Sequence, residues 1–483
     1  MPLLRVTNNQ FNTALQTIQN RFITLELLNY NYQIVDTLEG VAIDGAINID
    51  ANSDIRRTAS LKIVVNNSSF NVASGGKIWL DKYVRVYMGI KNLFADEIEW
   101  TNCGIYIIDA PSYEYDNTTN TLSLSLLDLM AKLTGVRNGY LPGIPAVLSA
   151  GENIRNAMID VLALGGFNQY IVEEAPSPSV IPNDLEFGQG STVYALLNGL
   201  KEIYPFYEIF FDTNGIFYYK QIPTGENEPI LVDDTLWKNI VIKEDIEVDF
   251  QEVKNVIEVY GRTHNPAHFS SKTTVSGNTI QLNIEDVTGY TEDMIYGFTL
   301  TDNPGYSNMY LKINNLPSYP IKLDDGTTSA TINAEAGEIY FCVQFKNNYW
   351  NWLGHLQSYG YAEDTNPDSP YYINGTVGKI RLPLYSGEYE NIFSDNLAKQ
   401  RAEYELWLHT NMNNSVQLTC ITVPWLDVNV LVSYTPQRET TPSLYIIKSI
   451  SFGLGVEGTM TVNMIKFYPE KTNIANLRKE LKV

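Results

Sequence analysis

The chain has 483 residues, 44% apolar and 18% charged, which is long enough for about three folded domains and unlike a disordered protein. Its 55 acidic and 33 basic residues give a formal net charge of −22, which argues against a protein that neutralises nucleic-acid phosphates or adsorbs to an anionic membrane. Three widely separated cysteines and an N-terminus without an apolar signal core favour a protein folded in a cytoplasm, without a disulfide framework.

The first segment, from about residue 20 to residue 135, alternates apolar and polar residues. In TLSLSLLDLM, Leu122, Leu124 and Leu126 oppose two serines, and FITLEL and YVRVYMGI repeat the pattern. A period of two residues is typical of strands with one face in a core. Polar turns between the runs favour an antiparallel barrel or sandwich, and we assign residues 1–140 to this first β block.

Helical patterns begin after residue 145. SAGENIRNAMIDVLALGGF has a capping-box match at Ser149 and Glu152, an apolar stripe at helical spacing, and two glycines that end it. STVYALLNGLKEIYP predicts a second helix, and Asn214-Gly215 predicts a hairpin in YEIFFDTNGIFYYK. Residues 141–228 are therefore expected to form a small α+β domain.

Strand patterning resumes in NVIEVYG, stops in a Gly-, Tyr- and Asn-rich stretch, and returns after a predicted helix, SDNLAKQRAEYELWLHT. The simplest account is a second barrel made by residues 229–262 and 389–469, with another β domain, residues 263–388, inserted into it. Residues 470–483 are expected to form a short helical tail.

No motif for catalysis, a cofactor or a metal is present. HNPAH has a proline between its histidines and is not a helix, and HExxH, P-loop and GxSxG patterns do not occur. GLGVEG matches GxGxxG, but the strand-like TMTVNM follows it instead of the helix that a dinucleotide site needs, so a hairpin turn is predicted. We expect no catalytic residue, no cofactor and no metal ligand.

One aromatic stretch leaves two interpretations open. Trp350 and Trp352 alternate in YWNW, so on a strand both face the same side. That side is either a core or module interface, or a platform for a glycan. The following acids would suit a glycoside hydrolase only if two carboxylates flanked a sugar-lined cleft, and solvated acids on a β domain are the alternative.

Several of these segments together resemble the hub, or tail-tip, proteins of tailed bacteriophages. VAIDGAINIDANSDIRRTASLKIVV and NTLSLSLLDLMAKLTG resemble the opening barrel of such hubs, and VPWLDVNVLVSY with IIKSISFGLGVEGTMTVNMIKFYPE resembles their second barrel. AGEIYFCVQFKNNYWNWLG looks like a small β module of tail-fibre and tail-tip proteins. The resemblance implies a mainly β (α+β) chain: two tail-tube-like antiparallel β-barrels, an intervening small α+β domain and an inserted β domain.

The resemblance also implies a role without turnover, as a structural virion protein assembled in the host bacterial cytoplasm. In such hubs three chains form a ring with six tube-like positions. One face of this homotrimer meets the tail-tube or distal tail protein ring, and the other meets a central spike or fibre. Phage DNA passes transiently through the bore, and the acidic balance of this chain would avoid trapping it, although solubility is an alternative reason for the charge.

Five residues are candidates for the subunit interface. Arg56 and Arg57 lie between two runs of alternating residues, and arginine suits bidentate pairing with carboxylates, so we expect them to join neighbouring barrels or the tube ring. A solvated turn beside Asp54 is the alternative. In the tail, Ile474, Leu477 and Leu481 share one side of the predicted helix.

Two hypotheses from other functional classes remain open. Residues 263–388 could carry a module that binds a host-surface glycan, and the chain could be a cell-wall-degrading tail enzyme. Glycan binding by the isolated insertion would favour the first hypothesis. Turnover that is abolished by changing one acidic residue would favour the second.

Overall fold

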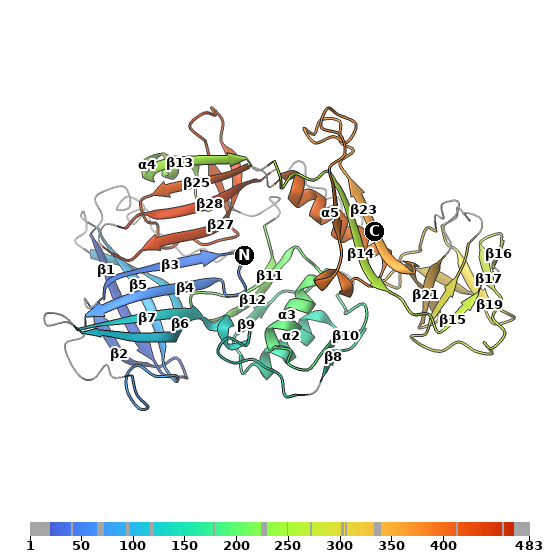
Figure 1. Cartoon of the computed structure of the whole chain (residues 1–483), viewed down its shortest axis with the longest axis horizontal. Helices are drawn as coiled ribbons and strands as arrows, with labels where there is room; N and C mark the ends of the chain where they lie inside the picture. The colour runs from blue at the N-terminus through green and yellow to red at the C-terminus, as the bar shows by residue number, and fades with distance from the viewer. Residues whose placement is uncertain are drawn as a thin grey trace.

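The computed structural model describes residues 20–467, apart from residues 40–41, 65–71, 93–96, 116–119, 144, 177–178, 224–228, 249, 271–272, 301–303, 305–306, 333–339, 412–413 and 456–457. The molecule is elongated (Figure 1): one large sheet lies at one end, a unit with two helices lies near the middle, and a small β module lies at the other end. Among the helices described, none has both the length and the apolar character needed to cross a membrane.

The large sheet has twelve strands and contains both β blocks. Its order is β13-β25-β28-β27-β3-β4-β7-β6-β5-β1-β2, with β26 also paired to β27. The strands are β1 (Arg21–Leu28), β2 (Ile34–Glu39), β3 (Ala42–Asp50), β4 (Arg57–Val64), β5 (Tyr83–Asn92), β6 (Glu97–Tyr115), β7 (Asn120–Asp128), β13 (Val241–Val248), β25 (Asn414–Cys420), β26 (Leu431–Tyr434), β27 (Ser443–Gly453) and β28 (Met460–Phe467). The short helix α4 (Asp234–Ile240) precedes β13.

Strand β3 joins the two β blocks. It pairs antiparallel with β4 on one side and with β27 on the other, so that Ile47 lies opposite both Ala59 and Phe452. Because alternate side chains of a strand point to one face, the apolar positions of both blocks reach one continuous core. The predicted fold class, mainly β with antiparallel tube-like barrels, is confirmed, and the two blocks share one sheet.

The α+β unit follows the first block. It contains η2 (Leu129–Lys132), β8 (Ala146–Leu148), α2 (Ile154–Leu164), β9 (Tyr170–Val172), β10 (Leu185–Phe187), α3 (Val193–Glu202), β11 (Tyr207–Phe211) and β12 (Phe217–Gln221). The predicted hairpin is confirmed, because β11 and β12 pair antiparallel around Gly215, whose φ is 79°. The capping box is wrong: the side chain of Asn153, not Ser149, accepts from the N–H of Asn156 at 3.0 Å and begins α2.

A second small unit contains β14 (Val256–Thr263), β23 (Gln357–Glu363), β24 (Arg381–Leu384), η3 (Gly387–Asn391) and α5 (Asp395–Asn411). We expected β14 and this helix in the second barrel, but β14 pairs with β23 and β24 instead. The reason is the helix itself. Ala398 and Ala402 of α5 cover the apolar face of β14 at Ile257 and Val259. Gly360 permits the close approach, because a Cβ there would lie 2.1 Å from the carbonyl carbon of Ala398.

The small β module interrupts this unit. Its strands are β15 (His268–Ser270), β16 (Thr273–Ser276), β17 (Thr279–Leu282), β18 (Ile295–Phe298), β19 (Tyr310–Ile313), β20 (Tyr319–Lys322), β21 (Phe341–Lys346) and β22 (Tyr349–His355). They form one eight-stranded sheet with an apolar core of its own. The chain leaves at the end of β14 and returns at the start of β23, where Thr263 and Gln357 are register partners.

Candidate functional site

Arg56 lies in the turn before β4, and its side chain is buried. Its guanidinium donates to the carboxylate of Glu208 on β11 and lies 3.9 Å from the ring centroid of Phe210. Glu208 also accepts from the side-chain amide of Asn429 at 2.5 Å, and the ammonium of Lys220 lies 3.3 Å from its other oxygen. One buried carboxylate therefore connects the first β block, the α+β unit and the second β block.

Arg57, the first residue of β4, connects the same three parts of the chain. Its guanidinium donates to the carboxylate of Asp427 in the second block and, at 2.6 Å, to the carbonyl oxygen of Phe211 on β11. Its backbone N–H donates to Asp128 at the end of β7, at 2.9 Å. The Arg57 side chain is 1% exposed, and Asp427 and Phe211 take the place of water at its two terminal nitrogens.

The charges at this junction are matched rather than isolated. Burial on its own would raise the pKa of Glu208, but the charges of Arg56 and Lys220 and the hydrogen bonds from Asn429 and Arg56 outweigh it and hold that pKa below its ordinary value. Burial raises the pKa of Asp128, against the opposing N–H groups of Arg57 and Met130. Removing one member of such a buried set would leave the others buried without a partner, so the junction stabilises the contact of three parts of the chain.

The structure corrects the expected role of the two arginines. Both pair with carboxylates, as their residue type indicated, but the partners Glu208 and Asp427 belong to the same chain. The guanidinium groups are enclosed where the β blocks and the α+β unit meet, so they have no surface to offer a neighbouring subunit. The earlier alternative, a solvated turn, is also wrong for both side chains, since they are 5% and 1% exposed.

The two tryptophans lie in the core of the small β module. Trp350 and Trp352 are 0% and 7% exposed, and both belong to its apolar cluster. The indole N–H of Trp350 donates to the carbonyl oxygen of Leu311 at 2.9 Å, which satisfies its polar atom inside the module. Neither ring offers a free face to a sugar, so the observation that favoured a glycan platform is removed. Ile474, Leu477 and Leu481 lie outside the described residues.

One cluster has the residue types of a nucleophile and a base. The ring Nε2 of His264 lies 3.1 Å from the hydroxyl of Ser358, and Asp395 lies 2.6 Å from Nδ1 of a second histidine, His355. Ser358 and His264 are 0% and 4% exposed, so no substrate can reach the hydroxyl. In the described part of the chain, no group of three or more His, Cys, Asp or Glu side chains is arranged to hold a metal ion.

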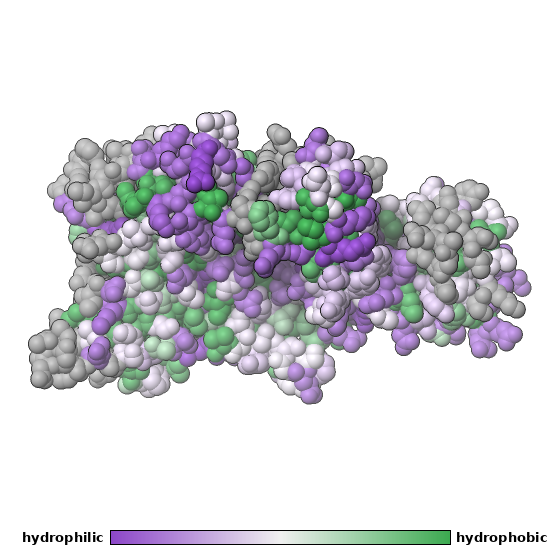
Figure 2. Space-filling model, turned by 45° about the horizontal axis from the view of Figure 1, so that its top comes forward, coloured by the Kyte–Doolittle hydropathy of each residue, from purple (hydrophilic) through white to green (hydrophobic). Residues whose placement is uncertain are grey.

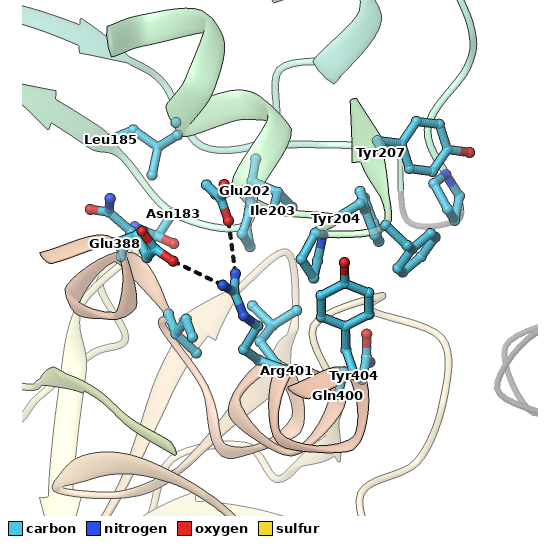
Figure 3. A pocket seen from close by; sticks show the side chains of 18 of the residues that line it. Asn183, Leu185, Glu202, Ile203, Tyr204, Tyr207, Glu388, Gln400, Arg401 and Tyr404 are labelled. Carbon is cyan, nitrogen blue, oxygen red and sulfur yellow. Dashed lines mark hydrogen bonds and ion pairs between the residues drawn. The ribbon is translucent and has the colours of Figure 1, made fainter. Parts of the chain in front are cut away.

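A cavity of about 370 Å³ lies between α3 and its loops on one side and α5 on the other. Figure 3 shows Arg401 of α5 pointing across it, paired with Glu202 at 2.7 Å and with Glu388 at 2.9 Å. Glu405, one turn along α5, also accepts from Arg401 at 2.7 Å. The rest of the lining is largely apolar and aromatic, including Leu185, Ile203, Tyr204, Phe206, Leu397 and Tyr404.

The ion pairs that line this cavity connect α5 and the turn η3 to α3. Burial would lower the pKa of Arg401, but the neighbouring charges of Glu405 and Glu202 raise it above its ordinary value. For Glu202, burial is likewise outweighed by Lys201 and Arg401, so its pKa is lowered. Arg401 is therefore fully occupied by protein carboxylates, and the cavity offers mainly apolar surface and tyrosine hydroxyls.

Sequence reasoning missed these partner residues. Glu208 lies within the otherwise apolar YEIFF, and an acid in such a strand signals a buried partner because charged groups are seldom buried unpaired. Arg401 and Glu405 are spaced i, i+4 in the predicted helix, which indicates a local pair. Neither signal names the distant partner.

Comparison with known proteins bears on the fold. A family model described as a domain of unknown function (DUF5048) matches residues 368–470. The chain resembles the 43 kDa tail protein of prophage MuSo2 from Shewanella oneidensis at 11% identity and a TM-score of 0.53, covering 93% of this chain and 99% of that one. It also resembles a tail protein from Neisseria meningitidis, at 10% identity and a TM-score of 0.50, covering 93% of this chain and 99% of that one. No curated protein sequence matches. The predicted likeness to phage tail proteins is therefore confirmed as a likeness of fold.

Proposed function

We propose that this chain, which shares its fold with prophage tail proteins, is a structural virion protein and forms the trimeric hub of a phage tail tip or baseplate. The observation that carries the proposal is the pairing of β3 with β27, which sets two antiparallel β blocks side by side in one sheet. Three such chains would supply six tube-like positions around one axis. The ring could then meet a six-fold tail tube on one face and a three-fold spike or fibre on the other.

The two outer edges of the large sheet support ring assembly. In the described residues, β2 pairs only with β1, and β13 pairs only with β25, so both edge strands present unpaired backbone groups. Both also carry exposed apolar side chains, Ile34 and Val35 on β2 and Ile242 and Ile246 on β13. Figure 2 shows green patches among purple at its upper left, where β13 and β25 lie in Figure 1. A neighbouring chain would cover these edges.

The net charge of the chain and the burial of Ser358 and His264 fit a protein that forms a channel and catalyses no reaction. A formal net charge of −22 would let DNA leave through the bore of the ring without being held, because like charges repel. The buried Ser358 and His264 cannot act on a substrate. We therefore propose no enzymatic activity, a place in the virion, and contacts with the tube or distal tail ring and with a spike or fibre.

Mass and symmetry test this proposal. Native mass spectrometry of the purified chain, or of the tail tip released from particles, should give a species of three chains, each of 54.5 kDa. Changing Ile242 and Ile246 to Lys should reduce the trimer, whereas changing Leu164, which is 69% exposed at the end of α2, to Lys should not. Six copies of the chain in one ring of the particle would rule the hub out.

A further inference from the structure

The cavity between α3 and α5 lies beside the point where the described chain ends. Phe467, the last residue of β28, packs on Trp407 of α5, with ring centroids 6.1 Å apart. Trp407 in turn lies 5.9 Å from Tyr404, whose ring lines the cavity. An aromatic path therefore leads along one face of α5 from the end of β28 into the cavity. Residues 468–483 begin at the entrance of this path.

The surface of the cavity matches the sequence that follows Phe467. Its lining is mostly apolar. Its charged residues are Arg401, the carboxylates of Glu202 and Glu388 that pair with it, and Glu174, which accepts a hydrogen bond from the side chain of Asn153 at 2.6 Å. The sequence of residues 468–483 has four basic and two acidic residues, Glu470 and Glu480, and an apolar stripe at helical spacing. The basic residues are Lys471, Arg478, Lys479 and Lys482, and the apolar ones are Ile474, Leu477 and Leu481.

We propose that residues 468–483 dock in this cavity of their own chain, with Ile474, Leu477 and Leu481 facing the apolar lining and a basic residue facing Glu174. This occupant replaces a neighbouring subunit as the partner of the tail. The docked tail would brace α3 of the α+β unit against α5. The inference does not depend on the hub role, because it concerns contacts inside one chain.

The lengths agree with such docking. Along a helix, Ile474 lies about 10 Å and Leu477 about 15 Å beyond Phe467. Counting back along α5 from Trp407, Gln400 lies about 10 Å and Leu397 about 15 Å away. A tail that turned back along α5 would thus place Ile474 near Gln400 and Leu477 near Leu397, and both of these α5 residues line the cavity.

Cross-linking in the full chain tests the proposal. Gln400→Cys is combined in turn with Ile474→Cys, Leu477→Cys and Leu481→Cys, and a short bismaleimide is added; the three native cysteines are buried. The matched control moves the first cysteine to position 399, since Lys399 is exposed and does not line the cavity. Intact mass and denaturing electrophoresis separate links within one chain from links between chains. Unchanged circular dichroism confirms that each variant is folded.

We expect at least one tail position to link to position 400 within one chain about tenfold faster than to position 399, because docking raises the local concentration beyond that of a loose tether. In a second measurement, the triple variant with Asp at positions 474, 477 and 481 should exchange the amide hydrogens of α3 and α5 several-fold faster than the parent. Equal linking at positions 399 and 400, links mainly between two chains, or unchanged exchange would each overturn the proposal.

Discussion

Arg57 on β4 donates a hydrogen bond to the carboxylate of Asp427, 370 residues further along the chain. The same guanidinium donates to the carbonyl oxygen of Phe211, so one side chain contacts the second β block and the α+β unit at once. With Arg56 and Glu208 beside it, this pair attaches the α+β unit to the two β blocks, which already share one sheet.

The first prediction concerns Arg57. Changing Arg57 to Ala should lower the free energy of unfolding by about 2–5 kcal/mol, because the carboxylate of Asp427 and the carbonyl oxygen of Phe211 lose their buried donor. The matched control is Lys62→Ala, whose ammonium lies 3.6 Å from Glu114 in an exposed pair and should contribute about 0–1 kcal/mol. Urea unfolding of the purified chain measures both. Equal losses for the two variants would show that the junction does not hold the units.

The second prediction concerns acid stability through Glu208. The folded pKa of this carboxylate is lowered, so its contribution is complete above the unfolded value of about 4.3 and is lost as the pH falls toward the folded pKa. Glu208→Gln should therefore reduce stability near pH 7 and flatten the decline below about pH 4.3. Calorimetry from pH 7 downward measures this, with Glu247→Gln on the exposed strand β13 as control. Parallel pH profiles for parent and Glu208 variant would refute it.

The third prediction concerns His264. Burial lowers its pKa to about 4, so the folded chain keeps the ring neutral while the unfolded chain protonates it below about pH 6.5. Stability should fall by roughly 3 kcal/mol as the pH drops from about 6.5 to about 4. His264→Gln should remove this part of the pH dependence, and His409→Gln, on the outer part of α5, should not. Chemical unfolding at several pH values in this interval checks the difference.

The fourth prediction concerns the small β module. Because Thr263 and Gln357 are register partners, an Asn-Gly turn can replace residues 264–356 and join β14 directly to β23. The shortened chain should keep the protection of the twelve-stranded sheet in hydrogen exchange and should assemble as the parent does. Some stability of α5 should be lost, since Phe393 packs against Cys342 and Leu353 of the module.

The control for the module is a full-length chain with Trp350→Ala. That change should remove about 3–5 kcal/mol from the core of the module and give it a separate, earlier thermal transition. The transition of the large sheet should stay in place. If the shortened chain aggregates, or if Trp350→Ala unfolds the whole molecule in one step, the module is not an independent unit.

The sequence predicts whether an element is a helix or a strand better than it predicts which other elements that element packs against. Period-two patterning identified the strands of both β blocks because one face of each is buried. The same patterning misplaced β14, since it shows that a face is buried and not whether a helix or another strand covers it. Trp350 and Trp352 were placed on one side of a strand for the same reason, and only packing decides that this side is the core.

The partners of Arg56 and Arg57 could not be predicted from the sequence for the same reason. Adjacent arginines in an acidic protein indicate carboxylate partners, but the local sequence around Arg56 contains no information about Glu208 or Asp427, which the fold brings from distant segments. The position of Glu208 inside an apolar strand was the one usable signal. The tertiary fold decides which distant segments meet around these charges. The pattern of apolar and polar residues in one sequence shows only which faces are buried.

The pairing of β3 with β27 also fixes an order of events during synthesis. Asn48 and Ser451, which hydrogen-bond across this joint, are 403 residues apart, so one edge of the first β block stays open until β27 has left the ribosome. An open edge can pair with another nascent chain, and late non-local pairing is slow. The sheet can therefore be completed only after β27 has been made, and a chain cut short before β27 would keep β3 uncovered.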